Sequence, residues 1–217
     1  MNKQTNSPSA EIIQEIITRL WQTHPDAHCE LNYDTPHQLL VATILSAQCT
    51  DERVNKVTPA LFTRYPTPAD YAAANRTELE ELIRSAGFYR QKARFIQESA
   101  HAIVHEHGGT VPQEMNGLLQ LKGVARKTAN VILGEIYGIA DGITVDTHVK
   151  RIAYKLGLTS TDKDPVKVEQ ELMKIIPRDQ WINISHLLIF HGRRICIARR
   201  PDCPNCPLDD LCPSAEL

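Results

Sequence analysis

The sequence has no long hydrophobic run. Its longest apolar stretch, Leu39–Ala47, is far too short to cross a bilayer. The opening residues, MNKQTNSPSA, are polar and lack the apolar segment of a secretory signal peptide. We therefore expect an intracellular protein, located in the cytoplasm, in which disulfides are rare. The six cysteines then need another explanation.

Alternating apolar and polar residues, the pattern of a half-buried strand, are also scarce. The best strand candidate is the short, isolated segment Gly142–Val149. Helical periodicity dominates instead, and proline and glycine separate the helical segments. The sequence therefore predicts an all-α protein of one or two domains. We expect helices at residues 9–24, 36–48, 51–65, 77–86, 91–107, 114–119, 126–137, 147–156, 165–176 and 180–195.

The chain lacks a strong excess of either charge, because its formal net charge is −2. Two segments nevertheless contain several basic residues and no acid: Arg84–Ile96 and His186–Arg200. The second holds Arg193, Arg194, Arg199 and Arg200. Local basic faces of this kind favour a phosphate-bearing partner more than the total charge does. A solvated helix face explains each segment equally well.

The C-terminal tail lacks helical periodicity and is rich in proline and cysteine. Its cysteines, spaced C-x6-C-x2-C-x5-C, are Cys196, Cys203, Cys206 and Cys212. Four thiolates in a short irregular loop can surround one metal centre, either zinc or a 4Fe–4S cluster. Zinc sites more often pair two C-x2-C knuckles, and only one is present. No flavin or nicotinamide fingerprint accompanies the tail, so a structural role for a cluster competes at least equally with a redox role.

The segment LKGVARK, residues 121–127, has the pattern of two helices joined by a tight hairpin. Gly123 permits a backbone that a side chain would forbid, and the following helix offers unpaired N–H groups to a phosphate oxygen. Lys127 lies one turn into this apolar helix. A desolvated lysine can act as a nucleophile and form a Schiff base. Asp146, in the segment TVDTHVKR, precedes the next predicted helix, so it is either a helix N-cap, a catalytic acid, or both.

Taken together, these segments resemble the endonuclease III family of DNA glycosylases. The resemblance rests on LSAQCTD (residues 45–51), LKGVARKTANVI (121–132), VDTHVKR (145–151), FHGRRICIARRPDC (190–203) and the four-cysteine spacing. The segments occur in the family's order and span almost the whole chain.

The resemblance implies two helical lobes with a cleft between them. A six-helix bundle with the helix-hairpin-helix motif would span residues 29–140. An iron–sulfur domain would join residues 1–28 to 141–217 and hold a 4Fe–4S cluster on the four cysteines. The partner would be double-stranded DNA with damaged pyrimidines or abasic sites, bound by a monomer associated with the nucleoid.

The implied chemistry is base excision. The damaged nucleotide is extruded from the duplex, Lys127 attacks its sugar, and Asp146 assists. A Schiff base forms, and β-elimination then cuts the strand. Expected substrates are oxidised pyrimidines.

By the same resemblance, Gln48 would fill the gap in the helix and Phe88 would insert between bases of the other strand. A core position is the alternative for Phe88, and a helix-terminal hydrogen bond is the alternative for Gln48. His148 would support Asp146, bind phosphate, or be a satisfied buried histidine. The other expected DNA contacts are Lys122, Gly123, Ala125, Arg126, Arg193, Arg194 and Arg199.

The hairpin departs from the family pattern L-P-G-V-G at two positions. Lys122 replaces the proline and could add a phosphate contact, whereas Ala125 replaces the second glycine. Alanine can still donate its N–H to phosphate if its φ is negative, but a positive φ would strain the hairpin.

Two other functions compete with this interpretation. A mismatch-type adenine or thymine glycosylase of the same superfamily shares the cluster and the aspartate but usually lacks the hairpin lysine. A non-catalytic DNA-binding module, or an electron carrier, would use the cluster as its working part.

Overall fold

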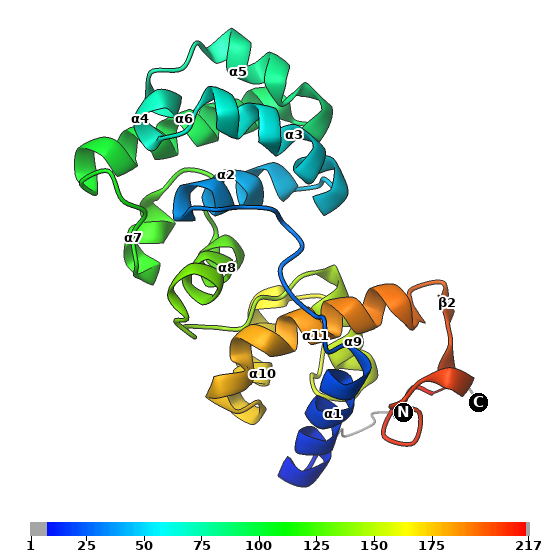
Figure 1. Ribbon diagram of the computed structural model, residues 1–217. Helices are drawn as coiled ribbons and strands as arrows, with labels where there is room; N and C mark the ends of the chain where they lie inside the picture. Colours follow the sequence, from blue (N-terminus) through cyan, green and yellow to red (C-terminus); the bar gives the residue numbers. More distant parts are fainter. Residues whose placement is uncertain (1–7, 216–217) are drawn as a thin grey trace. The chain divides into compact units, whose positions relative to one another are not determined.

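The computed structural model describes residues 8–215, and its regular secondary structure is almost entirely helical (Figure 1). The all-α prediction is confirmed. The outer ends of the predicted iron–sulfur domain, residues 1–7 and 216–217, lie outside the described residues. None of the described helices has the length and hydrophobicity needed to cross a membrane.

Contacts divide the chain into two compact units, and each is described by itself. The first unit is Glu30–Ile139, and the second contains the described residues before and after it. The first unit contains α2 (Pro36–Ser46), α3 (Asp51–Arg64), α4 (Pro68–Ala72), α5 (Arg76–Leu82), the 3₁₀ helix η1 (Arg84–Ala86), α6 (Tyr89–Glu106), α7 (Met115–Gln120) and α8 (Arg126–Tyr137).

Within this unit, α6 is the longest helix and packs against α2, α4, α5 and η1. Helix α2 also contacts α3 and α8. Every side chain of α2 from Leu39 to Leu45 is buried, which explains its nearly continuous apolar sequence. The core of the unit is completed by fully buried residues of the surrounding helices, among them Leu61, Tyr71, Leu79, Ile83, Ile96, Ile103 and Leu118.

The second unit contains α1 (Ala10–Thr23), α9 (Thr147–Lys155), α10 (Pro165–Ile175), η2 (Arg178–Gln180), α11 (Trp181–Arg194), β1 (Cys196–Ile197), β2 (Arg200–Pro201) and η3 (Cys203–Asn205). Helix α11 packs against α1 and α9 around a core of aliphatic side chains. Strands β1 and β2 pair antiparallel directly after α11, so the chain reverses between Cys196 and the other three tail cysteines.

Helix starts follow the capping residues of the sequence. The side chains of Ser9, Thr35, Thr50, Thr67, Asn75, Asp146 and Asp164 each accept a hydrogen bond from a first-turn N–H. Proline occupies the first position of α2, α4 and α10, where its missing N–H costs no helical bond. The predicted helices therefore start and end within a few residues of the observed ones.

The best strand candidate, Gly142–Val149, does not form a strand. Residues 142–146 form no strand, and α9 begins at Thr147 because the Asp146 side chain caps it. Helix α4 was not predicted, since Pro66 and Pro68 suggested a break. Pro68 is in fact the first residue of α4, behind a reciprocal capping box between Thr67 and Asp70. The short strands β1 and β2 were not predicted either.

Burial of His37 makes the stability of the fold sensitive to pH. The side chain is 6% exposed and meets the edge of Tyr71, and burial lowers the pKa of His37 from 6.5 to about 4. Between pH 4 and pH 6.5, His37 therefore binds a proton in the unfolded chain but not in the folded chain. As a result, His37 does not lower the free energy of unfolding above pH 6.5, and it lowers this free energy progressively as the pH falls toward 4.

We predict that His37→Leu reduces the pH dependence of unfolding. Between pH 7 and pH 5 the wild-type protein should lose about 2 kcal/mol through this residue, and the variant should not. Urea unfolding at both pH values measures the difference. The exposed His101 provides the control, and His101→Leu should retain the wild-type dependence. If the free energy of unfolding falls by the same amount from pH 7 to pH 5 in the wild type and in His37→Leu, His37 is not the cause of the pH dependence.

Candidate active site and cysteine pocket

The hairpin between α7 and α8 is held on one side of α6. The Ser99 hydroxyl donates a 2.7 Å hydrogen bond to the Lys122 carbonyl. Gly123 has φ of +80°, and a Cβ added there would lie 2.8 Å from the Phe95 ring and 3.0 Å from the Phe95 Cβ. Glycine is therefore required at this position both for its backbone conformation and for its close contact with α6.

The first turn of α8 has no side-chain cap. Its N-cap residue is Ala125, with φ of −101°, so the backbone here is unstrained and the family's second glycine is not needed for a positive φ. An alanine cannot accept a hydrogen bond through its side chain, which leaves the first-turn N–H groups available to an anion. Most other helices of the protein fill the same position with Ser, Thr, Asn or Asp, as described above.

Lys127 is exposed on this uncapped first turn. Among the described residues, its amine has no hydrogen bond and no ion pair. The sequence suggested a desolvated amine, whereas the structure shows an exposed one without a partner. Lys122 and Ala125 are also exposed, and Arg126 is half-buried beside them.

Asp146 caps the N-terminus of α9. Its Oδ1 atom accepts 2.8 Å hydrogen bonds from the backbone N–H groups of His148 and Val149. No hydrogen bond joins Oδ2 to any described residue. The cap interpretation is therefore correct, and it leaves one carboxylate oxygen available in a fixed orientation.

His148 is half-buried, and its Nδ1 atom is buried without a hydrogen-bond partner among the described residues. The imidazole packs against Gly192 of α11, where an added Cβ would lie 2.9 Å from Nδ1. The ring is therefore only partly buried, and no described residue satisfies its Nδ1 atom. The contact of His148 with Asp146 runs through its backbone N–H and not through its ring.

Gln48 and Phe88 both project from loops of the first unit. Phe88 is 63% exposed, which excludes the core alternative. Gln48 is exposed, lies beyond the end of α2, and its side chain has no hydrogen bond to a described residue, which excludes the helix-terminal alternative. Both have positive φ, +54° for Gln48 and +45° for Phe88.

The predicted arginines differ in their surroundings. Arg194 donates two hydrogen bonds to the Asp26 carboxylate, at 2.8 Å and 2.7 Å, and its guanidinium carbon lies 4.4 Å from the centre of the Phe190 ring. This guanidinium lowers the pKa of Asp26 to about 2. Arg193, Arg199 and Arg200 are exposed. Arg194 therefore already has an anionic partner, and a phosphate would have to replace it.

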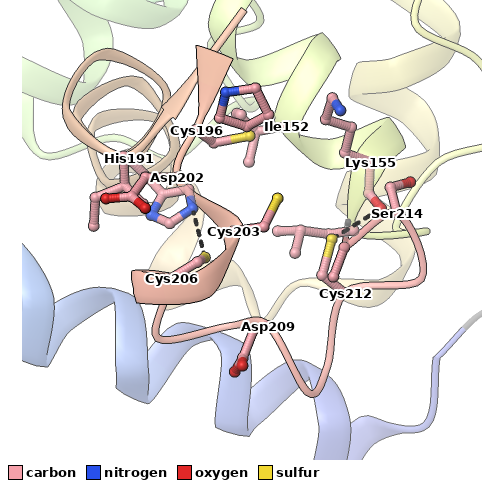
Figure 2. A pocket seen from close by; sticks show the side chains of 14 residues that line it. Ile152, Lys155, His191, Cys196, Asp202, Cys203, Cys206, Asp209, Cys212 and Ser214 are labelled. Atoms are coloured by element: carbon pink, nitrogen blue, oxygen red, sulfur yellow. Dashed lines mark hydrogen bonds between the residues drawn. The ribbon is translucent and has the colours of Figure 1, made fainter. Parts of the chain in front are cut away.

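The four tail cysteines line a single pocket (Figure 2). Their sulfurs point toward the same space, which is also bordered by His191 and by aliphatic atoms of Ile152 and Lys155. The two remaining cysteines, Cys29 and Cys49, lie elsewhere and are half-buried rather than fully buried.

The donor set suits a metal centre. Burial raises the pKa of the Cys206 and Cys212 thiols, and the neighbouring tail cysteines raise both further. Thiolates so close together repel one another, and a positively charged centre removes that penalty. Within residues 8–215, however, no three His, Cys, Asp or Glu side chains are arranged to hold a metal ion. The cysteines share a pocket without converging on one point.

Two residues around this pocket carry contacts that the sequence did not assign. Arg151 of α9 donates to the Cys196 carbonyl at 2.6 Å, and the same nitrogen lies 3.7 Å from the Cys196 sulfur. His191 of α11 contacts the Cys206 sulfur at 3.6 Å through Nε2 and His24 at 3.3 Å through Nδ1. Both lie in the matched segments VDTHVKR and FHGRRICIARRPDC, but only the fold shows which sulfurs they reach.

Comparison with known proteins places this arrangement in a family. Residues 41–178 match the model of the HhH-GPD superfamily base excision DNA repair proteins. Endonuclease III of Synechocystis sp. is 57% identical over 202 residues, which cover 93% of this chain and 92% of that protein. The chain belongs to the endonuclease III family.

Solved structures agree with this assignment. A trapped endonuclease III–DNA covalent intermediate shares 45% sequence identity and a TM-score of 0.90, covering 96% of this chain and 97% of the other. A thermostable thymine-DNA glycosylase has a TM-score of 0.84 at 20% identity, covering 94% of this chain and 97% of the other, and shows only the shared fold. As an endonuclease III family member, the protein is a base excision repair enzyme, a DNA glycosylase and AP lyase.

The hairpin geometry predicts an unusually costly glycine substitution. Gly123→Ala adds a Cβ against Phe95 at a positive φ and should lower the free energy of unfolding by about 2–4 kcal/mol. Gly109→Ala is the matched control, because φ is +82° there but no atom lies within 4 Å of the added Cβ. It should cost only about 1–2 kcal/mol. Urea unfolding measures both, and equal losses would refute the close contact.

Proposed function

We propose that this endonuclease III family member removes oxidised pyrimidines from duplex DNA and cuts the strand through a Schiff base on Lys127. The observation that carries this proposal is the exposed amine, unpartnered among the described residues, on an uncapped helix turn beside the glycine hairpin. An amine without an ion pair or a hydrogen bond to the protein can approach a substrate without first breaking such a contact.

The hairpin would bind the DNA backbone near the damaged nucleotide. The first-turn N–H groups of α8 can donate to a phosphate oxygen, and the helix dipole favours a negative charge there. Gly123, Ala125 and Arg126 are the residues proposed for this contact. The exposed Lys122 amine would add one further phosphate contact, which does not depend on base identity.

The proposed reaction begins with extrusion of the damaged nucleotide from the duplex. The neutral Lys127 amine forms a bond to C1′ of the sugar as the glycosidic bond breaks, and the base departs with that electron pair and takes a proton. The C1′–O4′ bond then breaks, O4′ keeps the electron pair and takes the second amine proton, and an imine remains between Nζ and C1′. Loss of a proton from C2′ then expels the 3′ phosphate by β-elimination.

Asp146 would assist the proton transfers and stabilise positive charge on the sugar. Its Oδ1 is fixed by two backbone N–H groups, and the free Oδ2 would face the reacting nucleotide. Gln48 and Phe88 would occupy the gap in the helix and the space between bases. His148, Arg193 and Arg199 would contact the backbone, and Arg194 only after exchanging Asp26 for phosphate.

The four tail cysteines would hold a 4Fe–4S cluster. The supporting observations are their common pocket and the raised thiol pKa values, which a bound cationic centre would offset. The cluster would order a tail that has little regular structure, with Arg151 and His191 hydrogen-bonded to its ligands. We further propose that the protein acts as a monomer on chromosomal DNA in the cytoplasm.

Covalent trapping tests the proposed nucleophile. Borohydride should reduce the imine between the wild-type protein and abasic-site DNA to a stable adduct, and Lys127→Ala should give none. Lys122→Ala is the matched control, because it removes a nearby exposed lysine and should still be trapped at saturating DNA. An adduct with Lys127→Ala as abundant as that with the wild type would exclude Lys127.

Release of an oxidised pyrimidine from duplex DNA tests Asp146. Asn can still accept the hydrogen bonds from residues 148 and 149, so Asp146→Asn should keep the fold of α9 and lose only the charge. We expect base removal to slow by about 10²-fold or more. Unchanged base removal would mean that Asp146 is only a cap.

Metal and sulfide analysis tests the proposed cluster. The purified protein should be brown and contain roughly four iron atoms and four acid-labile sulfides per chain. Cys203→Ala should lose both, whereas Cys49→Ala, outside the tail, should keep both. Stoichiometric zinc without sulfide in the wild-type protein would contradict the cluster assignment.

A further inference from the structure

Lys92 belongs to the basic segment Arg84–Ile96, yet its amine is not on the surface. The residue is 4% exposed, and Nζ donates to the Leu45 carbonyl at 2.7 Å and to the Ala86 carbonyl at 2.8 Å. No carboxylate of the described residues forms an ion pair with it. Burial lowers the pKa of Lys92. A buried cation without a counter-charge is costly, so it requires an explanation.

The two carbonyls are the free ends of two helices. Leu45 is in the last turn of α2, and Ala86 ends η1. In a continued helix the Leu45 carbonyl would accept from the N–H of Cys49, but Cys49 donates to Ser46 instead. No backbone N–H of a described residue donates to the Ala86 carbonyl. A lysine amine satisfies such carbonyls and is favoured by the helix dipole. Lys92 therefore caps both helix ends with one nitrogen.

The two capped ends lead directly into the loops of Gln48 and Phe88. Leu45 precedes Gln48 by three residues, and Ala86 precedes Phe88 by two. Among the described residues, these are the only non-glycine residues with positive φ. Such a backbone is unfavourable and persists only where the surroundings enforce it.

Phe88 is also tied to Lys92 through the main chain. The backbone N–H of Lys92 donates to the Phe88 carbonyl at 3.0 Å, in the first turn of α6. Lys92 thus holds the Phe88 loop from both its backbone and its side chain, while the same side chain holds the Gln48 loop. Its three donors on one nitrogen suit it to this bridging role.

We infer that Lys92 is a positioning residue that joins the Gln48 and Phe88 loops into one rigid unit for insertion into the DNA duplex. This inference rests on the proposed function of those two side chains. Without the amine, two helix-end carbonyls would be buried unsatisfied, and the loops could relax independently from their strained backbone. Lys92 itself touches no DNA in this account.

Lys92→Met tests the inference, because methionine has nearly the same length and no amine. Two substrates separate the possible roles: a duplex with a damaged pyrimidine, where the helix must be opened and filled, and a single strand with an abasic site, where neither is needed. The variant should remove the base from the duplex at least about tenfold more slowly, and its borohydride trapping on the single strand should equal that of the wild type. Lys56→Met, which removes an exposed lysine paired with Glu52, should match the wild type on both substrates.

A fluorescent 2-aminopurine opposite the damaged base reports the insertion itself. Wild-type protein should increase its fluorescence on binding as the base is unstacked, and Lys92→Met should do so much less. In a Phe88→Ala background, Lys92→Met should reduce the rate of base removal from the duplex by a smaller factor than it does alone, because both changes impair the same insertion into the duplex. If Lys92→Met does not fold, Lys92→Gln keeps an amide donor for one carbonyl and should give an intermediate defect.

The outcomes are distinct. Wild-type duplex activity and fluorescence in Lys92→Met would overturn the inference and leave the proposed function intact. Equal losses on the duplex and on the single strand would show that Lys92 only maintains the fold, which also overturns it. A wild-type protein that cannot be trapped on either substrate would overturn both the inference and the proposed function.

Discussion

One side of α6 holds the parts of the first unit that are proposed to meet DNA. Lys92, Phe95 and Ser99 follow one another at helical spacing along this side. Lys92 binds the ends of α2 and η1, Phe95 packs against Gly123, and Ser99 donates to the Lys122 carbonyl. The loops that carry Gln48 and Phe88 and the hairpin are therefore all held in place by contacts with α6. Lys127 follows the hairpin by only a few residues, so its backbone is held in place while its amine stays mobile.

The atoms proposed to react lack hydrogen-bond partners among the described residues, whereas two other basic side chains have them. Lys127 has no partner among the described residues, and Asp146 uses one carboxylate oxygen for the cap and leaves the second free. By contrast, the buried amine of Lys92 is bonded to two carbonyls, and Arg194 is held by Asp26. A nucleophile must be able to leave its resting contacts at little cost, whereas a positioning group must not. Lys127 and Lys92 illustrate the two requirements.

Local sequence signals predicted most helices and the main candidate residues, because capping residues, prolines and apolar spacing act over a few positions. The Asp146 cap and the Gly123 hairpin could be recognised for the same reason. The role of Lys92 could not be recognised, because a lysine in a basic segment is expected on the surface. Only the fold shows that α2 and η1 bury it. Arg194–Asp26 and His191–Cys206 join residues from separate segments of the chain, so no local pattern contains them. Pro68 was misjudged because a proline can either break or begin a helix.

The central claim is that the Lys127 amine bonds covalently to the sugar of the excised nucleotide. Tandem mass spectrometry of the borohydride-reduced protein–DNA adduct, after digestion of both components, locates the bond directly. We predict a single deoxyribose remnant on Nζ of Lys127, in the peptide that follows the hairpin. A remnant on any other lysine or on the N-terminal amine would contradict it.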